Sequence, residues 1–460
     1  TFYPSPRMAM DAPRERVAYV TAPDANAVLG RPGALHDGLA TIDLDPSSST
    51  YGQIIEMAEV PNFGDELHHS GWNACSAALC PYAPHPHVER RYLLLPALRS
   101  SRIYVFDTKP NPRKPQLVRT IEAEEIAAKT GYSRPHTLHC GPNGIYVCAL
   151  GNPKGEGPGG IFLLDCDSLN VLGRWEIDRG PQYLHYDFWW HLGYDTLISS
   201  EWGTPNMIEN GVIPELLLGR KYGHNLHIWD LRTRKHVQAL DIGDENQMAL
   251  ELRPAHDPTK AYGFMGCVIS VVDLSASVFL WYRDGDRWAV KKVITIPAEP
   301  ADKSQLPPLL QGFGAVPPLV TDINLSLDDR FLYVSCWGTG ELRQYDVSNP
   351  HEPKLVGSVH IGGIARRTPH PKTKEPLTGA PQMVEVSRDG KRIYFTSGLY
   401  TTWDEQFYPD GLKGWMVKVD AQEGGGIKLD PDFFVDFGPR RAHQVRLEGG
   451  DASSDSFCYP

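Results

Sequence analysis

The stretch that decides the fold is Arg330-Phe331-Leu332-Tyr333-Val334-Ser335, followed by Leu342-Arg343-Gln344-Tyr345-Asp346 and Lys354-Leu355-Val356-Gly357-Ser358-Val359. Its three segments are rich in aliphatic, β-branched and aromatic residues, and shorter polar segments separate them. Such a pattern is typical of consecutive antiparallel strands. The same three-part unit occurs at residues 91–95, 102–107 and 116–121. We interpret it as a structural repeat.

Five looser copies complete the repeat, at residues 39–43 (preceded by 16–20), 160–165, 226–230, 278–282 and 415–420. Seven β-rich copies about 50–75 residues apart are within the range of propeller blades with long loops. We therefore predict an all-β, seven-bladed β-propeller that spans residues 1–460 as one domain with insertions between blades. The strand near Val17 is expected to lie beside the C-terminal segment and close the ring. The only convincing helix covers residues 122–129.

Composition excludes several classes of protein. The chain has 460 residues, of which 41% are hydrophobic, and 45 basic against 56 acidic residues give a net charge of −11. An acidic chain without a basic run is a poor nucleic-acid binder, and no apolar run is long enough for a membrane span. Eight cysteines are too few for a disulfide scaffold. We expect a cytoplasmic location, or a periplasmic one if a signal peptide preceded Thr1. The sequence does not indicate the oligomeric state.

Three histidine clusters are the candidate functional residues: His68 and His69, His136 and His139, and His443. In the predicted propeller each cluster lies on the innermost strand of a blade or on the loop that enters it. Segments from different blades can converge on one axis, as a metal site requires. Histidine is the commonest metal ligand among side chains. A nearly all-imidazole site without thiolate suits copper, iron or zinc.

Other motifs are weaker candidates. The glycine-rich stretch 151–160 lacks the Gly-Lys-Ser/Thr ending of a phosphate loop and is better explained as a hairpin. The aromatic run 186–190 fits blade packing, although it could wall a small apolar pocket. Asp322 and Glu201 are candidate acceptors that orient a ligating histidine. For Glu201 we favour a simpler role at a turn.

Several long motifs resemble those of the selenium-binding protein family, whose members include methanethiol oxidases. The resemblance runs nearly end to end, from residues 13–15 to 453–455. The segments that carry it are DELHHSGWN (65–73), SSRIYVFD (100–107), YDFWW (186–190), SEWGTPN (200–206), LSLDDRFLYVS (325–335), LRQYD (342–346), GAPQM (379–383) and LYTTWDEQFYPD (399–410).

The resemblance implies a propeller and, for the oxidase members, copper. It also implies conversion of methanethiol, O₂ and water into formaldehyde, hydrogen sulfide and hydrogen peroxide. The histidine ligands proposed for the family match His68, His69, His139 and His443, and His136 lies in the same motif as His139.

The chain departs from the animal members at one position. Those proteins have a cysteine linked to selenium binding after the tyrosine that precedes DELHHSGWN, whereas here Gly52 follows Tyr51. Covalent selenium binding at that position is therefore not expected. Cys75 matches the family's Trp-Asn-x-Cys, and two roles stay open for it: a ligand or thiol-reactive group, or a buried structural thiol.

We therefore expect a copper-dependent thiol oxidase, with a small-molecule thiol and O₂ as its partners. His68, His69 and Cys75 are the predicted catalytic residues. Copper suits this chemistry because it cycles between two oxidation states and a thiol is a soft ligand. One alternative is a non-catalytic propeller that binds selenium, metal or proteins and has a structural histidine–metal site. Another is a hydrolase or lactonase with oxygen ligands, which the few acidic residues at inner-strand positions disfavour.

Overall fold

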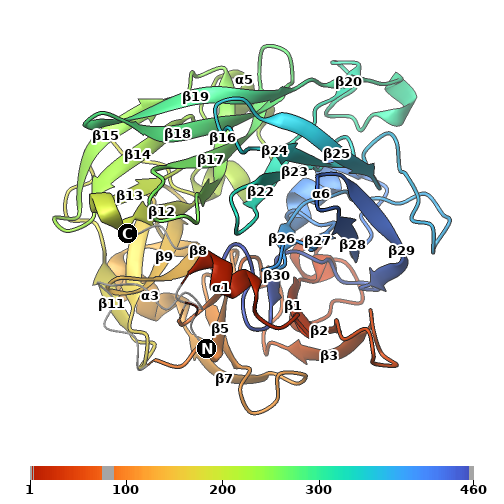
Figure 1. Ribbon diagram of the computed structural model, residues 1–460, viewed down its shortest axis with the longest axis horizontal. Helices are drawn as coiled ribbons and strands as arrows, with labels where there is room; N and C mark the ends of the chain where they lie inside the picture. Colours follow the sequence, from red (N-terminus) through yellow and green to blue (C-terminus); the bar gives the residue numbers. More distant parts are fainter. Residues whose placement is uncertain (1–2, 4, 75–87, 455–460) are drawn as a thin grey trace.

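Seven four-stranded antiparallel sheets surround a common centre in the computed structural model, which describes residues 3, 5–74 and 88–454 (Figure 1). This arrangement confirms the predicted seven-bladed propeller. Each of the seven sequence copies supplies the central strands of a different sheet, and the glycine-rich stretch 151–160 forms the hairpin between two strands of one blade. Except in the N-terminal blade, the first strand of each sheet in chain order lies nearest the centre (Figure 1).

The strands of the blades follow one another along the chain. The first blades contain β1 (Val17–Ala22), β2 (Gly38–Asp43) and β3 (Ile54–Glu59); β4 (Gly71–Trp72), β5 (Tyr92–Pro96), β6 (Ile103–Asp107) and β7 (Gln116–Ile121); and β8 (Ser133–Gly141), β9 (Gly144–Gly151), β10 (Gly160–Leu164) and β11 (Val171–Arg174). The middle blades contain β12 (Phe188–His191), β13 (Thr196–Ser199), β14 (Asn225–Asp230) and β15 (Lys235–Asp241); and β16 (Asn246–Pro254), β17 (Tyr262–Ser270), β18 (Ala276–Asp284) and β19 (Arg287–Ile296). The last blades contain β22 (Val320–Leu325), β23 (Phe331–Cys336), β24 (Glu341–Asp346) and β25 (Lys354–His360); and β26 (Val384–Val386), β27 (Arg392–Thr396), β28 (Trp415–Ala421) and β29 (Ile427–Asp436). A small two-stranded sheet, β20 (Glu299–Pro300) and β21 (Ala315–Val316), is inserted between two blades.

The C-terminal strand β30 (Val445–Leu447) closes the ring by completing the N-terminal blade. It pairs antiparallel with β1 and becomes the innermost strand of the sheet β3-β2-β1-β30. The predicted neighbourhood of the two chain ends is therefore confirmed. A second link joins the N-terminal segment to the last blade, because Glu15 accepts hydrogen bonds from Arg392 at 2.6 and 2.9 Å and from Tyr394 at 2.7 Å.

Helices cap the propeller rather than build it. The helix predicted at residues 122–129 is α3 (Ala123–Thr130), but α6 (Thr401–Phe407) was not predicted, because its threonine and aromatic residues resemble a strand. The other helical segments are α1 (Pro6–Met10), α2 (Ala25–Leu29), α4 (Pro205–Ile208), α5 (Pro214–Leu218), and the 3-10 turns Leu192–Tyr194 and Lys303–Gln305.

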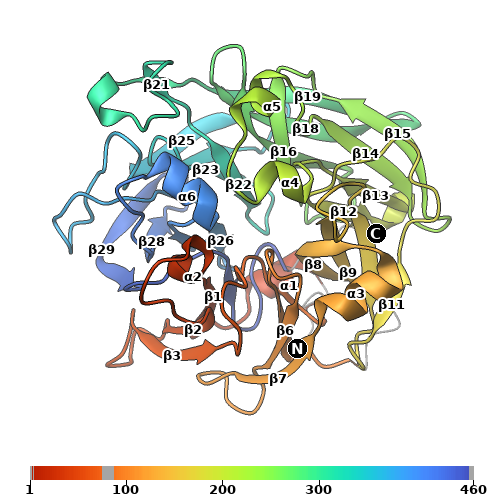
Figure 2. The ribbon, with the colours of Figure 1, turned by 180° about the vertical axis from the view of Figure 1, so that it is seen from behind.

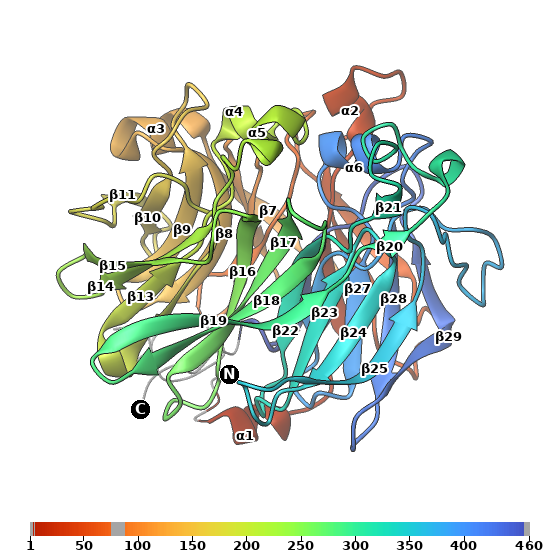
Figure 3. The ribbon, with the colours of Figure 1, turned by 90° about the horizontal axis from the view of Figure 1, so that it is seen from above.

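Two faces of the propeller differ in what covers them. Helices α2, α4, α5 and α6 lie on one face and α1 lies on the other (Figure 3). Seen from behind, α4 and α6 come close to the centre of the ring (Figure 2). Within the described residues, no helix has the length and apolar character needed to cross a membrane.

Candidate metal centre

Four histidine rings converge near the centre of the propeller. The ring centroid of His68 lies 3.8 Å from that of His443 and 4.9 Å from that of His69. His136 joins them, with its centroid 4.0 Å from His69 and 4.9 Å from His68. All four side chains are at most 2% exposed. The structure therefore brings together histidines from all three of the clusters found in the sequence.

The nitrogens of this cluster are available to a ligand. The Nε2 atoms of His69, His136 and His443 are buried, and none has a hydrogen-bond partner in the described part of the chain. One ring nitrogen from each of His68, His69 and His443 lies within 4.8 Å of the others. Buried polar atoms are normally hydrogen-bonded, so several orphan nitrogens at one place call for an ion or a ligand between them. Imidazole donors fit copper, iron and zinc, as the residue types suggested.

Hydrogen bonds to Nδ1 orient three of the rings. The Thr137 hydroxyl lies 3.0 Å from Nδ1 of His136 and 3.3 Å from Nδ1 of His69, so one oxygen holds two rings. His443 Nδ1 lies 2.7 Å from the carbonyl oxygen of Gly398. A carbonyl can only accept, so His443 carries its proton on Nδ1 and leaves the lone pair on Nε2. Partners of this kind usually orient metal-ligating histidines.

The backbone around the histidines is fixed by β1 and by a strained residue. Thr21 Oγ1 donates to the carbonyl of His68 at 2.8 Å and accepts from the amide of Gln444 at 3.0 Å. It thus links the two segments that carry His68 and His443. Glu66 adopts a left-handed conformation (φ 58°), which is costly for a residue other than glycine. Its buried carboxylate accepts from the amide and hydroxyl of Thr401, both at 2.9 Å.

The electrostatics keep the histidines neutral. Burial, followed by the proximity of the other histidines, holds the pKa values of His68, His69 and His136 well below their usual range. Burial lowers the pKa of His443 to about 4. Neutral imidazoles offer lone pairs, and metal binding requires that form.

One carboxylate approaches the cluster from inside the channel. Glu251 Oε1 lies 3.7 Å from His69 Nε2 and accepts a hydrogen bond from the Tyr186 hydroxyl at 2.8 Å. Its other oxygen accepts from Arg253 at 3.0 Å. Burial raises the pKa of Glu251 to about 7. Tyr186 comes from the aromatic run 186–190 and contacts His136, with centroids 4.5 Å apart, so this run both packs a blade and walls the site.

The structure does not bring His139 into the group. Its ring lies against Trp189, with centroids 4.0 Å apart, and its Nε2 lies 3.7 Å from Asp187 Oδ1. In the described residues its ring contacts are with Phe188, Trp189 and Trp190. His136 and His139 are three residues apart on β8, a spacing that turns side chains to opposite faces of a strand, and the pairing register with β9 shifts between Pro135 and Leu138.

The two carboxylates proposed to orient histidine ligands have other partners. Asp322 accepts from Arg253 at 3.1 Å and from the amide of Val384 at 2.7 Å. Glu201 lies 2.7 Å from Nε2 of His227, a histidine outside the three clusters. The oxygens that hydrogen-bond to the Nδ1 atoms of the clustered histidines therefore belong to Thr137 and Gly398.

Cysteines contribute little to the site as described. Cys75 lies outside the described residues, so its predicted role stays a prediction. Cys148 is buried beside the site, where its Sγ donates to the carbonyl of Tyr186 at 2.8 Å, and burial raises the pKa of its thiol. Gly52 occupies the turn between β2 and β3 with φ 72°, in the outer part of the N-terminal blade.

Sequence reasoning missed several residues that shape the site. Thr137 stands between the two histidines of its motif, and Gly398 and Tyr400 flank the start of a family-like motif. Tyr400 packs edge-on against His68, with centroids 5.8 Å apart. In the sequence these residues stand out only because they lie in or beside the quoted motifs. The fold shows that their segments contact the histidines.

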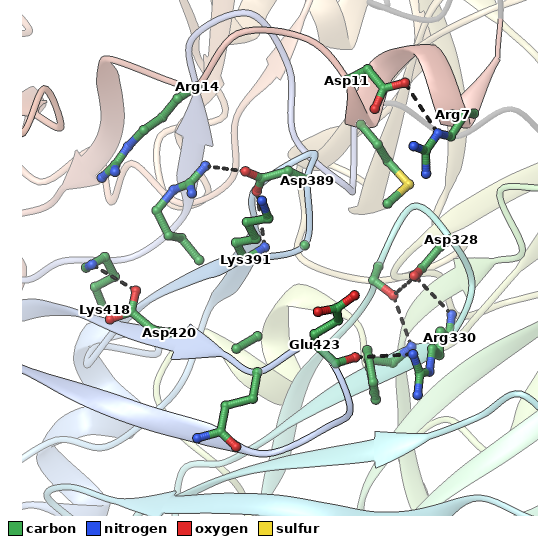
Figure 4. A pocket seen from close by; sticks show the side chains of 17 residues that line it. Arg7, Asp11, Arg14, Asp328, Arg330, Asp389, Lys391, Lys418, Asp420 and Glu423 are labelled. Carbon is green, nitrogen blue, oxygen red and sulfur yellow. Dashed lines mark hydrogen bonds and ion pairs between the residues drawn. The ribbon is translucent and has the colours of Figure 1, made fainter.

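A cavity of about 790 Å³ lies away from the histidines and is lined in part by Arg7 and Met10 of α1 (Figure 4). Charged side chains of both signs line it, and several of them pair with one another. Arg7 lies 3.3 Å from Asp11, and Lys418 lies 3.0 Å from Asp420. Its walls contain no histidine or cysteine among the described residues, so it does not compete as a metal site.

Comparisons with known proteins identify the family and agree with this fold. A family model described as 56 kDa selenium-binding protein matches residues 1–458. A methanethiol oxidase of Xenopus laevis is 42% identical over 98% of this chain and 97% of its own length. The methanethiol oxidase of Homo sapiens is 41% identical and selenium-binding protein 2 of Mus musculus is 40% identical, each with the same coverage.

Solved structures support the architecture. A hypothetical selenium-binding protein from Sulfolobus tokodaii has a TM-score of 0.96 and 57% identity, covering 100% of this chain and 99% of that one. A periplasmic gluconolactonase from Pseudomonas aeruginosa, with a TM-score of 0.57 and 12% identity over 94% of this chain and 99% of its own, shares the fold alone. The match to the family model over nearly the whole chain and the high identity to full-length relatives lead to one conclusion: this chain belongs to the 56 kDa selenium-binding protein family, which includes methanethiol oxidases.

Proposed function

We propose that this protein is a copper-dependent oxidase of small thiols, which converts methanethiol, O₂ and water into formaldehyde, hydrogen sulfide and hydrogen peroxide. The observation that carries the proposal is the set of orphan Nε2 atoms of His69, His136 and His443 in one buried cluster. The names of the relatives at about 40% identity supply the reaction.

His68, His69 and His443 would hold the metal, with His136 as a fourth candidate ligand. Copper bound there would supply one-electron redox chemistry between the thiol and O₂. His139 is left outside this set, because its ring faces Asp187 and Trp189. Cys75 remains a candidate without a structural argument for or against it.

The protein's own residues would prepare the reactants. Thr137 and Gly398 hold three rings with Nε2 toward the cluster, so little reorganisation is needed when a ligand binds. Glu251, whose pKa burial raises to about 7, lies 3.7 Å from His69 Nε2 and would accept the proton that a thiol loses, with Tyr186 orienting its carboxylate. Burial of all four rings excludes water, which limits side reactions of reactive products.

The test is metal analysis of protein purified without added metal, followed by O₂ uptake with methanethiol. We expect copper in the protein, thiol-dependent O₂ uptake, and release of sulfide and peroxide, all lost on copper chelation. His69→Ala should abolish uptake, while His139→Asn, which changes a histidine outside the cluster, should retain copper. Copper-loaded protein without thiol-dependent uptake would support the non-catalytic binding module instead, and zinc in place of copper would support a structural site.

A further inference from the structure

The histidine cluster lies behind a layer of protein. Its four rings are at most 2% exposed, and Tyr400 and Trp202, which contact His68 and His136, are 1% and 3% exposed. Both residues adjoin helices on the same face of the propeller: Tyr400 precedes α6 and Trp202 precedes α4. A substrate that reaches the histidines from this face has to pass between or beside these helices.

An apolar cavity lies at that face. Its volume is about 80 Å³, and its walls come from α5, from α6, from the blade β16–β19 and from the loop between β20 and β21. All the side chains that line it are apolar or aromatic, including Leu217, Val268, Leu310, Trp403 and Phe407. Leu218 and Phe313 at its edge are 57% and 50% exposed, so the cavity borders the outer surface.

One tryptophan connects this cavity to the site. Trp403 lines the cavity, and its ring centroid lies 5.5 Å from that of Trp202. The Trp202 centroid in turn lies 6.3 Å from His136 and 5.6 Å from Tyr186. Trp403 is anchored by a 2.8 Å hydrogen bond from its Nε1 to the carbonyl of Ile208 in α4. Two indole rings, tilted against each other, therefore lie between the cavity and the histidines.

The chemistry of the cavity selects its occupant. A volume of about 80 Å³ is small and suits a molecule of a few heavy atoms. Walls without polar groups offer no compensation for desolvating a charge, so a thiolate, an ammonium or a carboxylate is excluded. A small uncharged thiol meets both conditions, whereas an amino-acid or peptide thiol meets neither.

We propose that this cavity is the entry and selection pocket for a small neutral thiol, and that Trp403 and Trp202 are the gate between it and the histidines. The proposal rests on the thiol-oxidase function proposed above. It makes the cavity, rather than the metal ligands, the part of the protein that discriminates methanethiol from larger or charged thiols.

The experiment fills the cavity with a larger side chain and compares the kinetics of that variant with those of a matched control variant. Val268→Phe places a larger side chain into the cavity, whereas Val272→Phe makes the same change four residues on, at a side chain that is 71% exposed and outside it. We expect Val268→Phe to raise the KM for methanethiol about tenfold or more with kcat nearly unchanged, and Val272→Phe to change neither. Leu217→Trp, on the half-buried side of α5, is the second filling variant if Val268→Phe does not fold. Leu310→Ala should widen the pocket and improve kcat/KM for propanethiol relative to methanethiol.

Xenon binding provides a readout that does not depend on activity. Apolar cavities of this kind bind xenon, so crystals pressurised with the gas should show an atom in the wild-type cavity and none in the filled variant. If the variant whose cavity xenon shows to be filled oxidises methanethiol with the KM of the wild type, the pocket proposal is overturned and the oxidase function stands. A rise in the KM for O₂ alone would assign the cavity to O₂ and overturn the proposal as well. Copper-loaded wild type without any thiol oxidation would end the oxidase proposal, and the pocket proposal with it.

Discussion

His443 Nδ1 lies 2.7 Å from the carbonyl oxygen of Gly398, and this contact determines which ring nitrogen of His443 is left for the other histidines. The carbonyl accepts the Nδ1 proton, so the unprotonated Nε2 is left without a partner in the cluster. The amide of His443 also donates to the carbonyl of Thr21 at 3.0 Å, in the N-terminal blade. A single residue near the end of the chain thus depends on two blades for its orientation.

His443→Ala is expected to remove metal from the purified protein, because it deletes one of three histidines whose nitrogens lie within 4.8 Å of one another. His139→Asn is the matched control, since the His139 ring packs against Trp189 outside the cluster. Elemental analysis of both variants, purified in parallel, measures the result. Equal metal loss in both variants would contradict the proposed ligand set. Metal loss only in His139→Asn would make His139, and not His443, the ligand.

Thr137→Val should weaken metal binding without removing a ligand. The hydroxyl of Thr137 holds Nδ1 of both His69 and His136, and loss of such an outer partner typically costs about 10–100-fold in metal affinity. Thr137→Ser keeps the hydroxyl and should bind metal nearly as well as the wild type. Competition with a chelator of known affinity gives the ratio, and a valine variant as tight as the serine variant would show that the hydroxyl has no such role.

His185 should make the protein less stable in mild acid. It is buried, neither ring nitrogen has a hydrogen-bond partner among the described residues, and burial lowers its pKa to about 3. Between pH 6.5 and that value the unfolded chain binds a proton at this residue that the folded protein does not, so the free energy of unfolding falls as pH falls, by about 1.4 kcal/mol per pH unit.

Replacement of His185 by Leu should remove this contribution. The difference in free energy of unfolding between variant and wild type should therefore move in the variant's favour from pH 6.5 to 5, and stay constant above pH 7.5, where the residue is neutral in both states. Urea denaturation at several pH values measures it. A difference that does not vary with pH would show that His185 is not buried in its neutral form.

Glu15→Ala should destabilise the closed ring. It leaves Arg392, which is 7% exposed, without the carboxylate that it contacts at 2.6 and 2.9 Å. Removing one partner of a buried ion pair typically costs about 3–5 kcal/mol, and the cost here should be at the lower end because Asp389 still contacts the guanidinium at 3.0 Å. The double variant Glu15→Ala/Arg392→Met should recover part of the loss, because the buried guanidinium that lost its main partner is gone. Denaturation midpoints of the single and double variants measure the coupling, and purely additive effects would argue against it.

The repeat made the fold predictable, and the site was predictable only in part. Seven copies of one strand pattern, each with its own turns, have few alternatives to a ring of blades, and the strand near Val17 had to find a partner at the other end of the chain. Helix α6 escaped prediction because Thr401, Thr402 and Trp403 favour strands by intrinsic preference, whereas packing over the channel holds them helical.

The choice between His136 and His139 illustrates what sequence cannot supply. Both lie on β8, three residues apart, so their side chains point to opposite faces of the strand, and the sequence does not say which face turns toward His69. That choice depends on how β8 packs in its blade rather than on the residues of one strand. The partners Thr137 and Gly398 were invisible for a related reason, since a hydroxyl and a backbone carbonyl have no distinctive sequence pattern.

The pairing of β30 with β1 has a consequence during protein synthesis. A ribosome makes His68 and His69 long before His443, and β30 can join its sheet only after that. A growing or truncated polypeptide therefore has the first imidazoles without the final one, and cannot assemble the complete donor set. With the ligand set proposed above, a reactive ion would be bound only after β30 has closed the ring, so that incomplete chains would be spared oxidative damage.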